Sequence, residues 1–128
     1  MTIMNERIPV RVKSRILLIN PEDLECATAC GNYVRLHTAT EKYLVRGTIQ
    51  AFEQRLAHMG FIRVHRSTLV NVSRVVSVEV AASGDSLLHL SSGRSVTLSR
   101  TFRKPFFAFV TVPAAPPLAV HTRIAAAR

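Results

Sequence analysis

FIRVHRSTLVN, residues 61–71 of the chain, consists of two short apolar runs on either side of a polar stretch. Runs of this length, separated by so few polar residues, predict two strands that turn back on each other. The turn then presents guanidinium, imidazole and hydroxyl donors at the end of stiff β-structure. Guanidinium groups match phosphate oxygens and the O6/N7 edge of guanine, so this arrangement suits DNA.

Short strand patterns continue on both sides of this segment. We expect strands at 10–12, 15–19, 24–29, 33–37, 42–46, 61–64, 69–72, 75–80, 87–90 and 95–98. In 33–37 the residues Tyr33, Arg35 and His37 alternate with a valine and a leucine, which predicts one face in water and the other in the core. So many short strands indicate a mainly β domain with a sandwich-like or barrel-like core.

A clear helical period is present only at residues 48–59. An apolar stripe recurs there at Ile49, Phe52, Leu56 and Met59, with Gly60 as the residue after the helix. The polar face carries little net positive charge, so we expect this helix to brace the sheet. A DNA-recognition helix is the alternative.

The C-terminal part divides into two segments of different character. Residues 101–110 predict a short helical or coiled segment that packs Phe102, Phe106 and Phe109. From residue 111 the chain is rich in Ala and Pro, and we expect that tail to be disordered.

The charge balance indicates a polyanionic partner. The 128 residues fit one domain, and 17 Lys and Arg against 8 Asp and Glu give a net charge of +9. Between residues 61 and 104 the cations are mostly arginines, which favour bidentate recognition over diffuse attraction. A basic protein without a specific partner is the alternative on charge alone.

The two cysteines, Cys26 and Cys30, predict free thiols. Four positions apart on a strand they would be separated by roughly 13 Å, which is beyond disulfide reach. We expect them buried or half-buried in a reducing cytoplasm; a redox-sensing thiol is the alternative. The sequence shows no zinc spacing and no uninterrupted apolar run long enough to span a membrane, so we expect a cytoplasmic protein, not itself membrane-inserted, without metal or cofactor.

Three motifs, CGNYVRLH at 30–37, FIRVHRSTLVN at 61–71 and LSR at 98–100, occur in the order found in LytTR-type bacterial DNA-binding domains. The chain resembles that family over about residues 16–106. The resemblance implies an elongated stack of small antiparallel sheets with one bracing helix, whose loops enter successive major grooves. It divides the chain into a basic N-terminal tail at 1–14, the LytTR-like domain at 15–110 and the Ala/Pro-rich tail at 111–128.

The first motif supplies Asn32, Tyr33 and Arg35 as predicted DNA contacts. Asn32 suits adenine, and Tyr33 suits a thymine methyl or a phosphate. A turn asparagine beside a half-buried aromatic residue is the structural alternative. For Arg35 the two interpretations are a backbone contact and an ordinary exposed charge.

The second motif supplies Arg63, His65, Arg66 and Ser67. Arg66 is the residue that we expect to read a base or hold a phosphate, with Ser67 and His65 as phosphate donors. His65 could instead orient the loop or be a core histidine, and Arg63 could bind phosphate or form a surface ion pair. Asn71 fits a turn-holding role.

The third motif supplies Ser99, Arg100, Arg103 and Lys104. The resemblance implies that Arg100 is the main base-reading guanidinium, most plausibly on guanine, with Ser99 beside it. Arg103 and Lys104 then add phosphate contacts and salt dependence. An exposed arginine at a strand end is the alternative for Arg100.

The chain departs from the family in two respects. Cys26 and Thr28 occupy a stretch where family members often carry an aromatic and an acidic residue. Only residues 1–14 precede the first strand of the expected domain, so we expect no phosphate-accepting receiver domain within this chain. Control by abundance, self-association or a separate partner, such as a membrane-bound inhibitor, would then replace phosphorylation.

The expected function is a sequence-specific regulator that binds double-stranded promoter DNA, with two copies on direct repeats. An RNA-binding or general basic interaction module is the alternative, although the chain has no Trp and only 2 Tyr for stacking on bases. An enzyme that uses His65 and Ser67 is a third interpretation, which we reject because no carboxylate or oxyanion turn accompanies the pair.

Overall fold

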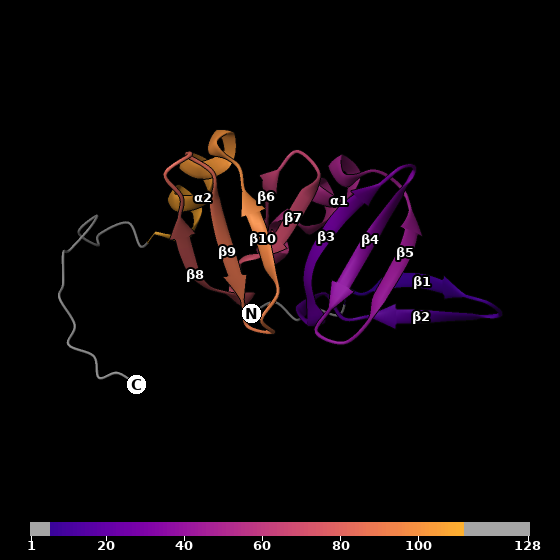
Figure 1. Ribbon diagram of the computed structural model, residues 1–128. Helices are drawn as coiled ribbons and strands as arrows, with labels where there is room; N and C mark the ends of the chain where they lie inside the picture. The colour runs from indigo at the N-terminus through magenta and orange to yellow at the C-terminus, as the bar shows by residue number, and fades with distance from the viewer. Residues whose placement is uncertain (1–5, 112–128) are drawn as a thin grey trace.

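The computed structural model describes residues 6–111, which form an elongated row of three antiparallel sheets (Figure 1). A hairpin of β1 (Ile8–Val12) and β2 (Arg15–Ile19) lies at one end. The central sheet has the order β5-β4-β3-β7-β6, and the third sheet has the order β10-β9-β8. The expected stack of small antiparallel sheets is confirmed.

The central sheet is built from two hairpins that meet at its middle strand. Its strands are β3 (Leu24–Cys30), β4 (Tyr33–Thr38), β5 (Lys42–Arg46), β6 (Phe61–His65) and β7 (Thr68–Asn71). Strand β3 pairs with β4 on one side and with β7 on the other. The third sheet consists of β8 (Val75–Val80), β9 (Ser86–Leu90) and β10 (Ser95–Leu98).

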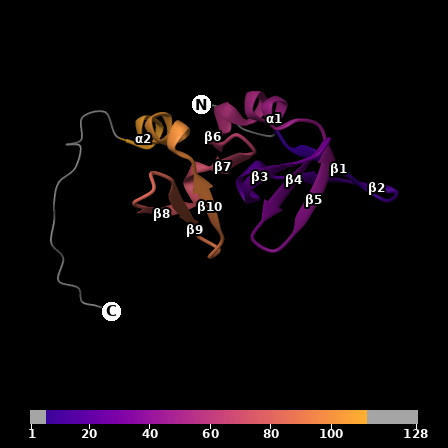
Figure 2. The ribbon, with the colours of Figure 1, turned by 45° about the horizontal axis from the view of Figure 1, so that its top comes forward.

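Two α-helices lie on the same side of the sheets, α1 beside the central sheet and α2 beside the third sheet (Figure 2). Helix α1 (Ile49–Leu56) begins where Thr48 accepts a hydrogen bond from the amide of Ala51 at 3.1 Å. A 3-10 turn, Ala57–Met59, follows it and ends at Gly60, whose φ of 90° places it in the left-handed region. The predicted position of Gly60 after the helical segment is therefore confirmed. Helix α2 (Arg103–Val110) follows the 3-10 turn Arg100–Phe102.

The hydrophobic core has two parts, because the central sheet is covered on both faces. One part lies between this sheet, the β1–β2 hairpin and α1, and includes Leu36, Phe52 and Leu69. The other joins the central sheet to the third sheet and α2, and includes Val64 and Phe106. The second part fixes the position of β10 relative to β6.

Four details differ from the sequence prediction. His37 is buried rather than exposed, because the β9–β10 side of the third sheet covers this end of β4, whereas Tyr33 at the other end of the same face stays exposed. Phe109 is half exposed, and Phe106 alone of the α2 phenylalanines is buried. Val72 begins a 3-10 turn, Val72–Arg74, after β7 has ended, because Asn71 caps that turn by accepting from the amide of Ser73.

The fourth difference lies near the N-terminus. Strand β1 begins at Ile8, two residues before the expected edge strand, and Ile8 and Val10 both contribute to the core. The segment predicted as a basic tail thus includes a strand in its second half. Residues 1–5 and 112–128 lie outside the described residues, so the predicted Ala/Pro-rich tail is not described beyond Thr111.

Candidate nucleic-acid interface

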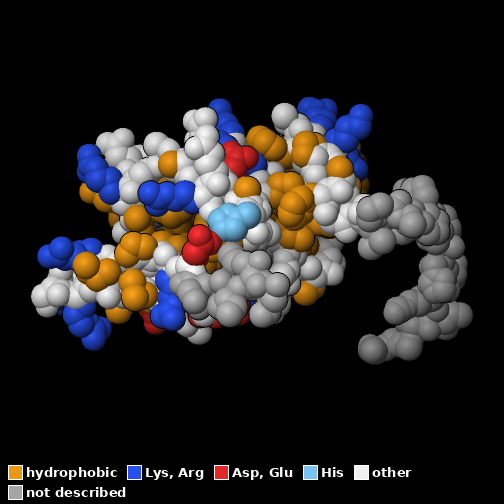
Figure 3. All heavy atoms as spheres, turned by 180° about the vertical axis from the view of Figure 1, so that it is seen from behind, with side chains coloured by type: hydrophobic (Ala, Val, Ile, Leu, Met, Phe, Trp, Pro, Cys, Tyr) orange, Lys and Arg blue, Asp and Glu red, His pale blue; other side chains and the backbone are white. Residues whose placement is uncertain are grey.

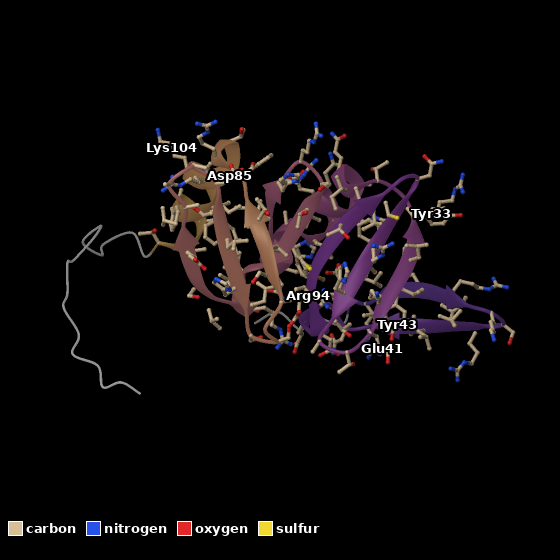
Figure 4. All side chains as sticks on the ribbon, in the orientation of Figure 1. Tyr33, Glu41, Tyr43, Asp85, Arg94 and Lys104 are labelled. Carbon is tan, nitrogen blue, oxygen red and sulfur yellow. The ribbon has the colours of Figure 1, made fainter. Side chains whose placement is uncertain are left out.

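Several loops that are far apart in the sequence lie along one edge of the molecule. Strands β3, β6, β8 and β10 all end there, and the loops that follow them lie side by side along the upper edge in Figure 1. We call residues 31–33, 46, 65–67, 81–85 and 99–104 the loop edge. Tyr33, Asp85 and Lys104 mark its extent in Figure 4, whereas Glu41 and Tyr43 lie on the opposite side.

The β3–β4 turn places Asn32 and Tyr33 in solvent at one end of the loop edge. Gly31 has a φ of 61°, which lets the chain reverse, and the carbonyl of Asn32 accepts from the amide of Gly47 at 3.0 Å. The side chain of Asn32 is exposed and its backbone is held. This geometry combines the turn role and the outward amide that the sequence suggested as alternatives.

Tyr33 is covered by an arginine that the sequence analysis did not single out. Arg46 lies opposite Tyr33 in the β4–β5 pairing, with its guanidinium carbon 5.7 Å from the centre of the ring. Its Nη1 donates to the Tyr33 hydroxyl at 3.5 Å. The sequence could have predicted this contact from the hairpin register. A two-residue turn before β4 and a three-residue turn after it bring these two residues together.

Arg35 is partly buried beside the same turn. Its Nη2 donates to Cys30 Sγ at 3.4 Å, which directs the guanidinium toward the end of β3. The contact is weak because sulfur is a poor acceptor. Arg35 is therefore more constrained than an ordinary exposed charge, although it lies next to the loop edge and not on its outer surface.

The β6–β7 turn is organised by Arg63, which makes three contacts within the protein. Its Nε donates to the carbonyl of His65 at 3.2 Å, its Nη2 to the carbonyl of Arg66 at 2.7 Å, and its Nη1 to Glu53 Oε1 at 2.6 Å. Of the two interpretations of Arg63, the ion pair is the one present. The same side chain holds both carbonyls of the turn, so Arg63 positions Arg66.

His65 and Ser67 close the turn from the other side. His65 Nδ1 accepts from the amide of Ser67 at 3.2 Å and lies 3.0 Å from the Ser67 hydroxyl. An accepting Nδ1 requires the proton of the neutral ring on Nε2. His65 is half-buried and orients the turn, as one of its predicted alternatives stated, and Arg66 is left exposed at the tip.

Arg100 is held in place by the loop between β8 and β9, which the sequence analysis did not single out. Its amide donates to Asp85 Oδ1 at 3.0 Å, and the preceding amide, of Ser99, donates to the carbonyl of Val64 at 2.9 Å. Gly84 has a φ of 103°, and a Cβ there would lie 3.1 Å from Arg100 Cδ. The β8–β9 loop thus forms a glycine platform under the exposed Arg100 side chain.

Arg103 and Lys104 extend the positive charge beyond Arg100. Together with Arg100 and Phe107 they line a shallow hollow of about 680 Å³ that runs along α2 as far as Thr111. Within residues 6–111, no carboxylate forms a salt bridge with Arg46, Arg66 or Arg100. The loop edge therefore offers guanidinium groups whose charge is not neutralised by these residues, which suits a polyanion.

Comparison with known proteins assigns the fold to a family. The family model described as LytTr DNA-binding domain matches residues 14–111. The chain belongs to the LytTr DNA-binding domain family. The sequence resemblance is thereby confirmed.

Individual relatives agree with this assignment. The chain is 28% identical over 102 residues to sensory transduction protein LytT of Enterococcus faecalis, covering 80% of this chain and 42% of that one. It is 24% identical over 106 residues to transcriptional regulatory protein LytR of Staphylococcus aureus, covering 83% and 43%. The chain thus spans less than half the length of these relatives.

A solved structure shares the fold. It is described as the LytTr DNA-binding domain of a putative methyl-accepting/DNA response regulator from Bacillus cereus, and it superposes with a TM-score of 0.76 at 18% identity. The match covers 85% of this chain and all of that one. The arrangement of three sheets and two helices is therefore that of a LytTr domain.

The LytTr domain also contains a polar cluster around the buried Glu25, away from the loop edge. We call Glu25, Cys26, His37, Ser92 and Arg94 the sheet junction, because they connect the central sheet to the β9–β10 loop (Figure 4). Glu25 Oε1 accepts from Ser92 Oγ at 2.8 Å and from Arg94 Nε at 3.3 Å, and its side chain is 1% exposed. A buried carboxylate needs such partners.

Burial dominates the protonation of the other two junction residues. It raises the pKa of Cys26 to about 11, with Arg94 acting in the opposite direction. It lowers the pKa of His37 to about 4, with help from the positive charges of Arg94, Arg35 and Lys42. Cys26 is consequently a protonated, poorly nucleophilic thiol at neutral pH, which argues against a redox role for it.

Among the described residues, no three His, Cys, Asp or Glu side chains group in a way that could hold a metal ion. None of the helices in the described ranges is both long and apolar enough to cross a membrane.

Proposed function

We propose that this chain is a sequence-specific, double-stranded DNA-binding transcriptional regulator. The observation that carries the proposal is the convergence of Asn32, Arg66 and Arg100 on one edge, from three loops of two different sheets. Each of the three is exposed, and each has its backbone fixed by hydrogen bonds from another part of the chain. Fixed backbones with free polar side chains suit the reading of base edges.

Arg100 is the proposed main base reader, on the O6/N7 edge of guanine. Arg66 reads a second base or holds a phosphate, and Asn32 suits the N6/N7 edge of adenine. In this proposal the loops at the two ends of the edge enter successive major grooves.

The remaining contacts go to the DNA backbone. Tyr33 and Arg46 act together as one phosphate-binding unit, since the arginine already lies over the ring. Arg103 and Lys104 bind phosphates from the start of α2, and Ser67, Ser99 and the Nε2 proton of His65 add neutral donors. Arg63 contributes to binding by holding the β6–β7 turn, and Arg35 by lying behind the β3–β4 turn.

An RNA-binding module is the alternative function. Proteins that read single strands stack bases on exposed aromatic rings. On the loop edge the exposed aromatic is Tyr33, and Arg46 lies over its ring. Direct competition between a duplex and single-stranded RNA of the same sequence distinguishes the two, and we expect the duplex to win.

The test begins with selection of bound duplexes from a random pool, followed by titration of the selected duplex and of scrambled duplexes. Arg100→Ala should lose about 1–3 kcal/mol of preference for the selected site, because a guanine fork discriminates by that amount. Lys104→Ala should weaken all duplexes alike and reduce the salt slope by about 1. Lys42→Ala removes a cation from the opposite side of the molecule and serves as the matched control.

Equal loss from Arg100→Ala and Lys104→Ala would contradict the base-reading role of Arg100. Selection that returns no preferred duplex would contradict the regulator assignment itself. Equal weakening by Lys42→Ala would mean that net charge alone, and not the loop edge, determines binding.

Two copies on directly repeated sites are the proposed arrangement on the promoter. The family resemblance also suggests a separate membrane-bound inhibitor as one form of control. Both remain predictions, and so does the cytoplasmic location. Recovery of the protein with the membrane fraction of its own cells, and its release from that fraction by the cognate signal, would support the inhibitor.

A further inference from the structure

A hollow of about 290 Å³ lies between the start of β1 and the end of α1. Its apolar floor consists of Ile8, Pro21, Phe52, Leu56 and Met59, all of them buried or half-buried. None of the described residues that line it belongs to the loop edge. Sites for small ligands are commonly lined by apolar side chains with a few polar groups, and their volumes begin at about 300 Å³. The hollow therefore has the lining of a small-molecule site and lies at the small end of the size range.

The rim of the hollow is polar and carries more positive than negative charge. Four described side chains form it: Glu6, Arg7, Arg55 and His58. Glu6 Oε1 lies 2.8 Å from His58 Nε2, so the carboxylate of the rim already has a partner. Arg7 and Arg55 are exposed and form no salt bridge with a described residue. Figure 3 shows this side of the molecule, where a histidine and an acidic side chain lie next to each other with hydrophobic and basic side chains near them.

A second hollow, of about 280 Å³, adjoins the first. The two hollows share Glu6, Pro21, His58 and Met59, so the Glu6–His58 pair stands between them. The second hollow is more polar and reaches Asn71. An elongated ligand that fills the first hollow thus has room to extend past the pair.

The floor of the hollow and the loop edge are connected through α1. Phe52 lines the hollow, and the next residue, Glu53, accepts from Arg63 Nη1 at 2.6 Å. Arg63 in turn donates to the carbonyls of His65 and Arg66. Hydrogen bonds along the backbone make a short helix move as one body. A displacement of α1 therefore reaches the β6–β7 turn through the ion pair between Glu53 and Arg63.

We propose that the hollow binds a small amphiphilic carboxylate, an apolar chain or ring with one acid group, and that this ligand weakens DNA binding. The apolar part covers the floor, and the carboxylate pairs with Arg55 and Arg7, because guanidinium groups bind carboxylates through two parallel hydrogen bonds. A cation of the same shape is repelled by these two arginines. The effect on DNA rests on the proposed function, whereas the binding site does not.

The ligand opposes DNA binding because it separates α1 from β1. Ile8 and Leu56 are 8% and 3% exposed and belong to the same core, so a ligand that reaches the floor of so small a hollow pushes the helix outward. Glu53 then moves away from Arg63, and the turn that presents Arg66 loses an anchor. Coupling between two sites is reciprocal, so the duplex weakens binding of the carboxylate by the same factor.

The first experiment tests the site on the full chain without DNA. The probe is sodium decanoate, kept below its micelle concentration, and binding is followed by calorimetry and by the shifts of backbone amide signals. We expect one site, with the largest shifts at residues 6–9 and 52–59. Decyltrimethylammonium has the same apolar chain with the opposite charge. It should bind at least about tenfold more weakly, because it loses a charge-assisted contact.

Two variants locate the probe. Arg55→Ala should weaken decanoate binding about tenfold for the same reason and leave DNA affinity without decanoate unchanged. Arg15→Ala is the matched control, because Arg15 is an exposed cation of β2 that does not line the hollow, and it should bind decanoate like the wild type. Met59→Trp fills the hollow without a change of charge and should block the probe, with thermal unfolding as the check that the variant is folded.

The second experiment tests the effect on DNA. Saturating decanoate should weaken binding of the wild type to the selected duplex about fivefold, at the low end of the usual coupling between sites. Arg55→Ala should need about tenfold more decanoate for the same effect. In Glu53→Ala the connection to Arg63 is absent, so decanoate should still bind and the duplex affinity should no longer respond to it.

Several outcomes would overturn the proposal. Absence of decanoate binding, equal binding of decyltrimethylammonium, or equal loss in Arg55→Ala and Arg15→Ala would each remove the site. Decanoate that binds without changing duplex affinity would remove its effect on DNA, and a response retained in Glu53→Ala would remove the route through Arg63. Failure of the wild type to bind the selected duplex without decanoate defeats the proposed function, whereas the titration without DNA decides the site in either case.

Discussion

The loop edge and the sheet junction use the same kinds of side chain for opposite purposes. On the loop edge Arg66 and Arg100 are exposed and form no salt bridge with a described residue. At the sheet junction Arg94 is committed to the buried Glu25. The comparison shows that an arginine of this domain is either left exposed, where its charge is available to a polyanion, or paired with a buried carboxylate between two sheets, and the surroundings of each arginine decide which.

The junction should matter most for stability. Arg94→Ala leaves the Glu25 carboxylate buried with a single hydroxyl donor, which should lower the free energy of unfolding by about 2–4 kcal/mol. Urea denaturation at pH 7 measures the change. The double variant Glu25→Gln with Arg94→Ala should recover part of the loss, because the uncompensated charge is gone. A double variant that is no more stable than Arg94→Ala would contradict this account.

Acid should weaken the same junction through His37. Its pKa is lowered from 6.5 to about 4 in the folded protein, so the unfolded chain takes up a proton first as the pH falls. The contribution of the neutral His37 ring to the free energy of unfolding is therefore fully present above about pH 6.5. It declines as the pH falls toward 4, and we expect a loss of about 2 kcal/mol between pH 7 and pH 5. His37→Gln should flatten that part of the stability profile, as followed by urea denaturation at several pH values. An unchanged slope in the variant would mean that another group titrates.

On the loop edge, Arg63 should affect binding through the turn and not through direct contact. Arg63→Ala frees the carbonyls of His65 and Arg66 and should lower the free energy of unfolding by about 1–2 kcal/mol. DNA affinity should fall while the salt slope stays that of the wild type, because no phosphate contact is removed. Arg63→Lys should not rescue binding, since a single ammonium cannot reproduce the fork. A reduced salt slope in Arg63→Ala would show that Arg63 touches phosphate after all.

The smallest expected effect is at Gly84. Gly84→Ala places a methyl group 3.1 Å from Arg100 Cδ on a backbone with a φ of 103°, so we expect a loss of about 1 kcal/mol in stability. The displaced Arg100 side chain should also lose part of its discrimination between sites. Gly93→Ala is the matched control, because its φ of 98° is similar but nothing lies within 4 Å of the added carbon. Identical site preference in the two variants would contradict the platform role of Gly84.

Most of the strands could be predicted because their signal is local. Period-2 alternation and turn residues located β2, β5, β8 and β10 at their observed bounds. The burial of His37 could not be predicted in the same way, because it results from a second sheet formed by residues about 50 positions later in the chain. No pattern within β4 distinguishes a face covered by solvent from one covered by protein.

The candidate site was predictable for the residues at loop tips. Asn32, Arg66 and Arg100 follow strand ends, and the sequence places polar side chains there. Arg46, Gly84 and Asp85 were missed because their roles depend on which loops become neighbours, and that is fixed by tertiary packing. The choice between the two roles of Arg63 likewise depended on Glu53 of α1 lying within reach.

The loop edge is connected by main-chain hydrogen bonds that cross between separate strands. The amide of Ala29 donates to the carbonyl of Ser67 at 2.8 Å, and that of Ser99 donates to the carbonyl of Val64 at 2.9 Å. Neighbouring loops therefore cannot rearrange independently. Association with a duplex should consequently show a heat-capacity change set by the buried surface alone, and an encounter rate governed by charge and diffusion instead of loop ordering.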